Sequence, residues 1–453
     1  MTKNLTVGNP ALLILAFTMP LLIGNLFQQF YSMADTFIVG NTIGVNALAA
    51  VGCTGSIIFL ILGFIFGFTA GTSIITAQRF GAGDMAGVRR SFAASLVLGI
   101  ILTIIITAVS VVAARPLLVA LRTPEEILED ARLYIMIIFW GSGAVVLFNI
   151  FSSVMRAVGD SRTPLIFLVI ACIINIILDY LFILGFRMGV EGAAIATVIA
   201  QLIAGLLCIP VIIKKLPMLA LTGADWKVSG VELKEHIRVA LPMGFQMSII
   251  AIGVVALQFA LNGLGTTAVA AFTAAQKIDQ FAGMPLNSFG AAMSTYTAQN
   301  YGARRIDRIR NGVIQCFLMT AVFSILIGVL FILTGTYLAA IFIGSNPEAV
   351  ALAHTYLVIT SCFYILLAFL LIIRQTLQGL GDSLFPTLAG IAELVMRMFA
   401  AITLSQFFGF TGLCFANPLA WFGACIPLGI AFILAMKKLN RQILAEKKQQ
   451  ARN

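Results

Sequence analysis

Residues 91–114 read SFAASLVLGIILTIIITAVSVVAA, an apolar stretch without a charged residue. A helix needs roughly 20 apolar residues to span the hydrocarbon core of a bilayer, which is about 30 Å thick. Stretches of the same character recur along the chain near residues 10–34, 47–77, 131–155, 163–184, 192–213, 237–262, 267–298, 312–335, 350–376, 385–408 and 412–436. The sequence therefore predicts an all-α integral membrane protein with about 12 transmembrane helices.

The composition of the whole chain agrees with this interpretation. Apolar residues make up 60% of the 453 residues and charged residues only 10%, whereas soluble domains carry about 25% charged residues. The net charge is +10, but the basic residues cluster in short segments between the apolar stretches, as the positive-inside rule predicts for cytoplasmic loops. We expect membrane lipid as a partner and no nucleic acid. The seven cysteines lie singly, without a CxxC pair.

The distribution of basic residues also predicts the orientation in the membrane. Loops on the side of the termini hold 21 Lys and Arg residues, whereas the opposite loops hold only Arg115, Arg122, Arg132 and Arg187. This excess predicts that both termini of the multi-pass protein lie in the cytoplasm. The first apolar stretch lacks a small-residue cleavage site and is expected to be a retained helix.

Two short motifs recur at almost the same interval. GDSRTP at residues 159–164 returns as GDSLFP at 381–386, and QRFGA at 78–82 returns as QNYGA at 299–303. The repeat predicts an N-terminal six-helix lobe (1–214), a cytoplasmic linker (215–236), a C-terminal six-helix lobe (237–436) and a basic cytoplasmic tail (437–453). Because six is even, both lobes enter the membrane from one face, as a parallel repeat does.

Two carboxylic acids interrupt apolar sequence in the first half. Asp35 follows Tyr31 by four residues and Asp179 follows Asn175 by four, so each acid shares a helical face with a polar neighbour. A charge at mid-bilayer costs about 2.5–3.5 kcal/mol on insertion scales, so each acid needs a reason to be there. One interpretation is a protonated carboxyl that only fixes helix packing. The other, which we favour, is a pair that exchanges a proton or a small cation.

The second half carries charges of a different kind. Lys277 and Asp279 interrupt one predicted helix, and each requires a partner on another helix because residues two apart do not share a face. Glu393 and Arg397 are four apart in the order that favours an ion pair within one helix. A polar network of these residues can serve structure or function equally well.

Taken together, these motifs resemble the multidrug and toxic compound extrusion (MATE) transporters of bacterial type. The resemblance covers essentially the whole chain, and it includes QQFYSMADTFIVG at 28–40, QRFGAG at 78–83, QNYGAR at 299–304 and GVEGAAIATVIAQ at 189–201. It implies two pseudo-symmetric lobes around a V-shaped cavity and antiport of organic cations or amphiphilic drugs against H⁺ or Na⁺, without a cofactor. By motif, the coupling residues are Asp35, Tyr31, Asn175, Asp179 and Thr197; for Na⁺, the implied ligands are Asp35, Asn175, Asp179 and Thr197.

The sequence departs from the family pattern in the second half. Some branches carry an acid on the seventh span and another on the tenth, which correspond here to residues 237–262 and 350–376. In this chain Gln246 stands at the position of the first acid, and the stretch around Leu366 is apolar. Gln246 is instead a candidate member of the C-lobe polar network. We therefore expect coupling in the first lobe.

Other functional classes fit the sequence less well. A flippase for lipid-linked saccharides, of related architecture, needs several inward-facing basic residues, and only Lys277, Arg374 and Arg397 qualify. The chain is not expected to be an enzyme or an ATP-driven pump, since it lacks DDxxD, HExxH and GxxxxGK[ST] motifs. His236 and His354 are expected to be solvated or interfacial. A channel is a further alternative that the sequence does not exclude. The protein is expected to act as a monomer on a small amphiphilic substrate.

Overall fold

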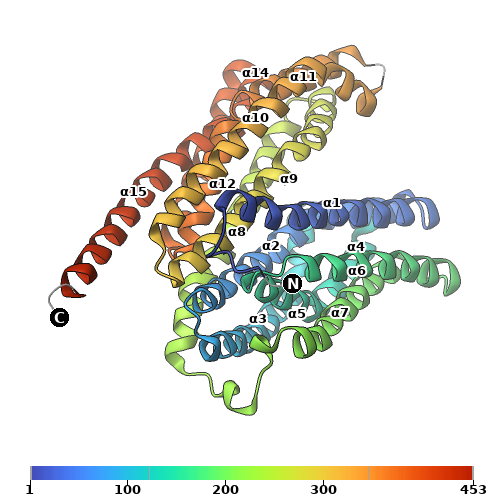
Figure 1. Cartoon of the computed structure of the whole chain (residues 1–453). Helices are drawn as coiled ribbons and strands as arrows, with labels where there is room; N and C mark the ends of the chain where they lie inside the picture. Colours follow the sequence, from blue (N-terminus) through green and yellow to red (C-terminus); the bar gives the residue numbers. More distant parts are fainter. Residues whose placement is uncertain (1–2, 122, 345, 451–453) are drawn as a thin grey trace. The chain divides into compact units, whose positions relative to one another are not determined.

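The computed structural model describes residues 3–121, 123–344 and 346–450, with side chains up to Arg441. Arg122 and Arg452, which entered the charge count, lie outside the described residues, as do the side chains of Lys447 and Lys448 in the tail. All regular elements in the described ranges are helical (Figure 1). The long helices are α1 (Pro10–Thr42), α2 (Val45–Gly81), α3 (Met85–Ala120), α6 (Arg162–Tyr180), α7 (Val190–Lys215), α8 (Gly230–Asn262), α9 (Thr266–Gly302), α10 (Ile306–Ile343), α13 (Leu384–Phe399) and α15 (Ala416–Gln450).

Length and composition identify a multi-pass membrane protein. Within the described part of the chain, nine helical segments are long and apolar enough to cross a bilayer. Two bent pairs raise the number to as many as 11: α4 (Glu125–Trp140) with α5 (Ser142–Ala157), bent by 46°, and α11 (Pro347–Ser361) with α12 (Tyr364–Gly379), bent by 52°. Helix α9 is 37 residues long but more polar than α2, its counterpart in the repeat, and is not among the 11.

The repeat seen in the motifs extends to the helices. The pair α11–α12 follows the pair α4–α5 at the same interval that separates the two GDS motifs. A π-helical turn, η1 (Leu181–Gly185), follows α6, and another, η4 (Ala400–Leu404), follows α13; α14 (Ser405–Cys414) completes that segment. Both GDS turns place glycine at positive φ, +88° at Gly159 and +86° at Gly381. Glycine adopts this conformation without steric cost, so the repeated motif encodes the same turn twice.

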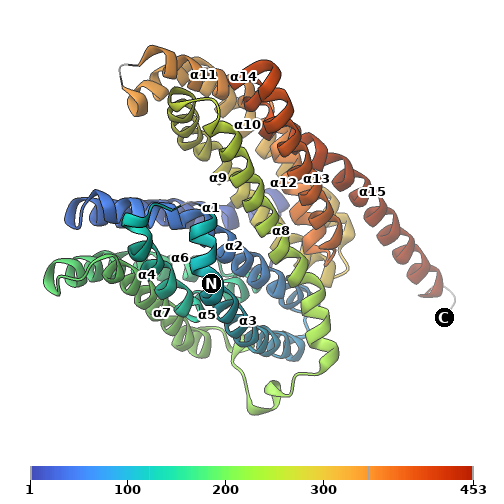
Figure 2. The ribbon, with the colours of Figure 1, turned by 180° about the vertical axis from the view of Figure 1, so that it is seen from behind.

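The described helices form two compact units that do not follow the expected lobe boundary. Unit 1 comprises Met1–Asn4 and Met19–Ser248, and unit 2 comprises Leu5–Thr18 and Ile249–Asn453. The beginning of α1 is thus grouped with unit 2, where the Leu5 amide donates to Gln299 Oε1 at 2.9 Å. The beginning of α8 is grouped with unit 1, where Glu232 lies 3.1 Å from Arg79. Figure 2 shows α8 and the unit 2 helices from behind.

A row of glycines explains why the start of α8 packs in unit 1. Gly63, Gly67 and Gly71 recur every four residues along α2. A Cβ atom on Gly67 would lie 2.3 Å from the carbonyl oxygen of Met243, and one on Gly71 would lie 2.5 Å from the Cα of Ala240. Small residues at this spacing let two membrane helices approach to backbone contact. The glycines of α2 therefore explain the short distance between α2 and α8.

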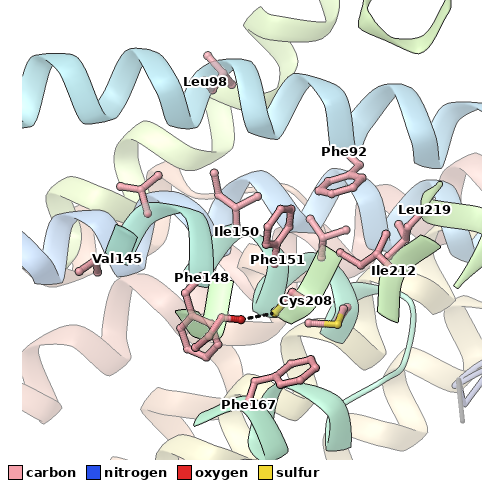
Figure 3. Close-up of a cluster of buried hydrophobic side chains, with 14 of the residues drawn as sticks. Phe92, Leu98, Val145, Phe148, Ile150, Phe151, Phe167, Cys208, Ile212 and Leu219 are labelled. Atoms are coloured by element: carbon pink, nitrogen blue, oxygen red, sulfur yellow. Dashed lines mark hydrogen bonds between the residues drawn. The ribbon is translucent and has the colours of Figure 1, made fainter. Parts of the chain in front are cut away.

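Buried apolar side chains hold α3, α5, α6 and α7 together in unit 1 (Figure 3). Phe92 and Phe151 meet edge to face, with ring centroids 5.9 Å apart. Phe148, Phe167 and Cys208 extend the cluster, and the Cys208 thiol donates to the Ala204 carbonyl at 3.2 Å. This packing fixes α6 against α7, the two helices that carry Asn175 and Thr197.

His236 differs from the expectation. It is fully buried rather than solvated, because the start of α8 packs into unit 1. Its Nε2 atom lies 2.8 Å from the hydroxyl of Ser91, and its Nδ1 atom lies 2.7 Å from the Glu232 carbonyl. The imidazole is therefore a structural link between α3 and α8.

Candidate ion-coupling site

Unit 1 contains a cavity of about 270 Å³ lined by both polar and apolar side chains. Helices α1, α2, α4, α5, α6 and α7 all contribute lining side chains. The polar ones are Gln28, Tyr31, Ser32, Asp35, Tyr134, Asn149, Thr197 and Gln201, and the apolar ones are Ile58, Leu62, Phe66, Ile138, Val145, Phe148, Leu168 and Val198. Such a mixed lining suits a ligand that is itself amphiphilic.

Four of the residues chosen from the sequence form a hydrogen-bonded chain beside this cavity. The Tyr31 hydroxyl, on α1, donates to Thr197 Oγ1, on α7, at 3.1 Å. The Asn175 amide, on α6, lies 3.4 Å from the same Thr197 oxygen and 3.5 Å from Asp179 Oδ1. With its amide oxygen and nitrogen exchanged, Asn175 donates to Asp179 Oδ2 at 3.1 Å and accepts from the Thr197 amide at 3.3 Å. In either orientation Asn175 lies between Thr197 and Asp179.

Asp35 and Asp179 are buried, and neither pairs with a cation among the described residues. Asp179 is completely buried and Asp35 is 8% exposed. Asp35 Oδ1 accepts no hydrogen bond from the described residues, and none of the ion pairs formed by those residues includes either acid. Two uncompensated buried charges are strongly unfavourable, and carboxylates in this setting can take up a proton or a cation.

Several polar residues of the cavity were not chosen from the sequence. Tyr134 and Asn149 come from helices without a buried acid, so no local pattern marked them. Gln28 precedes Asp35 by seven residues on the same face of α1, which is a signal that could have found it. Gln201 follows Thr197 by four residues and shares its helical face, which is a signal that could have found it. Its Oε1 atom is buried without a donor among the described residues, as is Asp35 Oδ1. Two orphaned acceptors therefore line one cavity.

The ligand chemistry of the site is restricted to oxygen. Within the described ranges, no three His, Cys, Asp or Glu side chains gather as a metal site of that kind requires. Asp35, Asn175, Asp179 and Thr197 offer two carboxylates, an amide and a hydroxyl. Oxygen ligands of this type suit hard cations, and the carboxylates alone can take up protons.

The charges of the second half form a separate network in unit 2. Glu393 lies between two guanidinium groups, 2.5 Å from Arg374 and 3.1 Å from Arg397, so the ion pair expected from the spacing of Glu393 and Arg397 is confirmed. The Tyr364 hydroxyl donates to Asp279 at 2.5 Å. Lys277 is exposed on the other side of α9.

Gln246 was expected in the network of the second half, but it lies in unit 1, where it is 1% exposed. The reason is the glycine row of α2, which draws the first part of α8 into that unit. Asp279 and Glu393 are both grouped with unit 2.

Comparison with known proteins gives the family. The MatE family model matches residues 20–181 and again residues 242–403. The probable multidrug resistance protein YpnP of Bacillus subtilis is 31% identical, and the match covers 95% of this chain and 94% of that protein. The FAD transporter of Shewanella oneidensis is 26% identical, with 90% of each chain covered.

A solved structure shows the same fold. It is described as the outward-facing conformation of a multidrug resistance MATE family transporter of the MOP superfamily, and it matches with a TM-score of 0.88 at 25% identity. The match covers 97% of this chain and 99% of that chain. Both halves of the repeat fit one family model, and the match extends over more than half of the sequence. The chain belongs to the MatE family, the multidrug and toxic compound extrusion (MATE) transporters.

Proposed function

We propose that the protein is a secondary antiporter that exports organic cations or amphiphilic drugs in exchange for H⁺ or Na⁺. The observation that carries this proposal is a pair of buried acids that no cation among the described residues neutralises. Asp35 lines the cavity, and Asp179 is linked through Asn175 to Thr197 in the same lining. The names of the relatives support efflux of small molecules in general. The protein would lie in the bacterial inner membrane with both termini in the cytoplasm, and would act as a monomer without a cofactor.

In this mechanism the two carboxylates hold the coupling ion and their neighbours orient them. Asn175 positions Asp179 and is itself positioned by Thr197, while the Tyr31 hydroxyl links Thr197 to the helix that carries Asp35. Binding of a proton or Na⁺ removes negative charge from the meeting place of α1, α6 and α7. Because a buried charge is costly, its neutralisation changes which packing of these helices is favoured. Bending of the first lobe would then release the cargo outward.

The cavity also indicates the class of cargo. Its lining includes Phe66, Phe148 and Leu62, which offer flat and flexible apolar surface, and Asp35, which supplies negative charge. A cationic amphiphile would satisfy both kinds of lining at once. Ion and cargo would then compete for the same negative charge, which is the simplest way to couple entry of one to departure of the other.

The proposal is tested by dye efflux from reconstituted vesicles, with proton and sodium gradients imposed separately. Asp35→Asn should keep the protein folded, as judged by its elution from a sizing column, but should abolish gradient-driven efflux. Asp130→Asn is the matched control, because Asp130 is an exposed acid on α4. Normal efflux by Asp35→Asn would remove this residue from the mechanism, and an uncoupled current in reversal-potential measurements would indicate a channel.

The flippase alternative is less well supported. Its recognition of a pyrophosphate would require free basic side chains inside the helix bundle. Arg374 and Arg397 are both engaged with Glu393, and Lys277 is exposed. Arg374 and Arg397 are therefore committed to an internal network.

A further inference from the structure

The internal repeat identifies the residues of unit 2 that correspond to the proposed coupling site of unit 1. The two bent helix pairs begin at Glu125 and at Pro347, and the same interval relates Tyr134 to Tyr356. Continued into the next helix, it relates Asn175 to Arg397. The motifs GVEG at 189–192 and GFTG at 409–412 are separated by a slightly shorter interval, which relates Thr197 to Asn417. These are the residues to compare.

Corresponding residues of the two units form corresponding hydrogen bonds. In unit 1, Asn175 lies within hydrogen-bond distance of Thr197, at 3.4 Å. In unit 2, Arg397 Nε donates to Asn417 Oδ1 at 3.3 Å. A guanidinium group therefore stands where unit 1 has a neutral amide.

The surrounding residues make room for this guanidinium. The interval between Pro20 and Pro242 relates Tyr31 to Gly253, so a glycine stands where unit 1 has a tyrosine ring. A Cβ atom on Gly253 would lie 2.7 Å from Arg397 Nη1. Arg397 is only 5% exposed, and its other terminal nitrogen donates to Glu393 at 3.1 Å. Glycine at position 253 therefore leaves the space that the Arg397 guanidinium group occupies.

The carboxylates of unit 1 have no counterparts at the related positions of unit 2. The interval between the two GDS motifs relates Asp35 to Leu257 and Asp179 to Ala401, which are both apolar. The acid of this region in unit 2 is Asp279, which comes from α9. It accepts from the Tyr364 hydroxyl at 2.5 Å.

A short series of hydrogen bonds runs from the arginine to Tyr356. Arg397 donates to Asn417, and the Asn417 amide donates to the Tyr356 hydroxyl at 3.1 Å. Both donors point away from the guanidinium group, so each bond polarises the next one.

The charge balance of the two places is therefore opposite in kind. In unit 1, neither buried acid pairs with a cation among the described residues. In unit 2, Arg374 and Arg397 both pair with Glu393, so this cluster carries its own cations.

We propose that Arg397 is a tethered cation that fills, in unit 2, the place of the exchangeable ion of unit 1. Unit 2 then binds no coupling ion, and unit 1 alone sets the number of ions exchanged for each cargo molecule. The inference rests on the proposed coupling site of unit 1.

The first test measures ion-dependent thermal stability of the full chain in detergent, with NaCl compared with choline chloride and with a pH series in constant salt. The wild type should show an ion-dependent shift of the unfolding temperature. The double variant Asp35→Asn/Asp179→Asn should show none. A residual shift in that variant, removed by adding Asp279→Asn, would prove an ion site in unit 2 and overturn the inference. Absence of any shift in the wild type would instead refute the coupling site of unit 1.

The second test empties the proposed place. Arg397→Ala leaves a space of guanidinium shape and keeps the Arg374–Glu393 ion pair, so the protein should fold with a lowered unfolding temperature. Low-millimolar guanidinium chloride should raise that temperature relative to choline chloride, whereas the wild type and Arg397→Lys should not respond. No response of Arg397→Ala would contradict the tethered-cation assignment.

A double-mutant cycle checks the contact without any ligand. Gly253→Ala should lower the unfolding temperature of the wild type, because the added Cβ atom meets the guanidinium. In the Arg397→Ala background the same substitution should cost much less. Equal costs in both backgrounds would mean that Gly253 does not accommodate Arg397.

Discussion

At the scale of single residues, the Tyr31 hydroxyl joins two helices of the proposed coupling site, α1 and α7. Tyr31 donates to Thr197 at 3.1 Å, and a net hydrogen bond is worth about 0.5–1.5 kcal/mol. Tyr31→Phe should therefore weaken ion binding by about 2- to 12-fold, since about 1.4 kcal/mol corresponds to a factor of ten. The measurement is the ion concentration that gives half of the maximal stability shift. Tyr180→Phe, on an exposed tyrosine at the end of α6, should leave that concentration unchanged. An unaltered value for Tyr31→Phe would exclude this bond from the site.

Asp225 offers a residue-scale prediction outside the membrane spans. Hydrogen bonds from the Thr222 hydroxyl and amide, at 2.7 and 2.8 Å, lower the pKa of the Asp225 carboxyl, and Arg89 at 3.4 Å adds to the effect. A lowered pKa in the folded state stabilises the linker above the pKa of the unfolded state, and that contribution is lost as the pH falls through the folded value. Pepsin cleavage of the linker should therefore increase as the pH falls below about 4.

The control for this experiment is Asp225→Asn, which cannot gain or lose the charge. Its linker should be cleaved faster than that of the wild type at the upper end of the pepsin range, and the difference should vanish at the lower end. Rates are normalised to an unfolded substrate, because pepsin activity itself depends on pH. A difference that persists at low pH would show that the carboxylate charge is not the cause.

At the scale of elements, the close packing of α2 against α8 depends on the face of α2 that carries the glycine row. A Cβ atom on Gly67 would collide with the Met243 carbonyl, which is backbone and cannot rotate away. Gly67→Ala should therefore destabilise the protein by about 1–3 kcal/mol, as overpacking does, and should lower the apparent unfolding temperature. Gly55→Ala, on the same helix with open space around it, should have no cost. Equal behaviour of the two variants would mean that the close contact is absent in solution.

The sequence predicts most elements but not their bends. The stretch 131–155 was expected to be one span, whereas the structure divides it into α4 and α5 with a 46° bend. The bend occurs at Gly141, where a Cβ atom would lie 2.2 Å from Val198 on α7. Hydropathy records only that a segment prefers lipid, so a bend caused by a neighbouring helix leaves no local signal. The same limit applies to the site: Asn175 and Asp179 are visible as a pair on one helix, but Tyr134 enters the cavity from another.

Across the whole molecule, the repeat was visible in the sequence, while the exchange of helix beginnings was not. Short motifs such as GDSxxP report the repeat because both copies encode the same turn. The assignment of Leu5–Thr18 to unit 2 depends on contacts with the far end of the chain, such as Asn300 to the Leu5 carbonyl at 3.2 Å. Contacts between such distant parts of the sequence have no periodicity to mark them. A boundary drawn at the linker therefore cuts through both units.

This exchange predicts how the protein behaves when the chain is divided in the linker after Thr222. The N-terminal fragment would lack the start of α8, with the Glu232 partner of Arg79 and the backbone that fits Gly67. The C-terminal fragment would lack Leu5–Thr18, whose amide and carbonyl groups satisfy Gln299 and Asn300. Each fragment expressed alone should aggregate, because buried polar groups and apolar surface would be left without partners. Co-expressed fragments should purify together on a tag carried by only one of them. A monodisperse N-terminal fragment on its own would show instead that unit 1 is complete without α8.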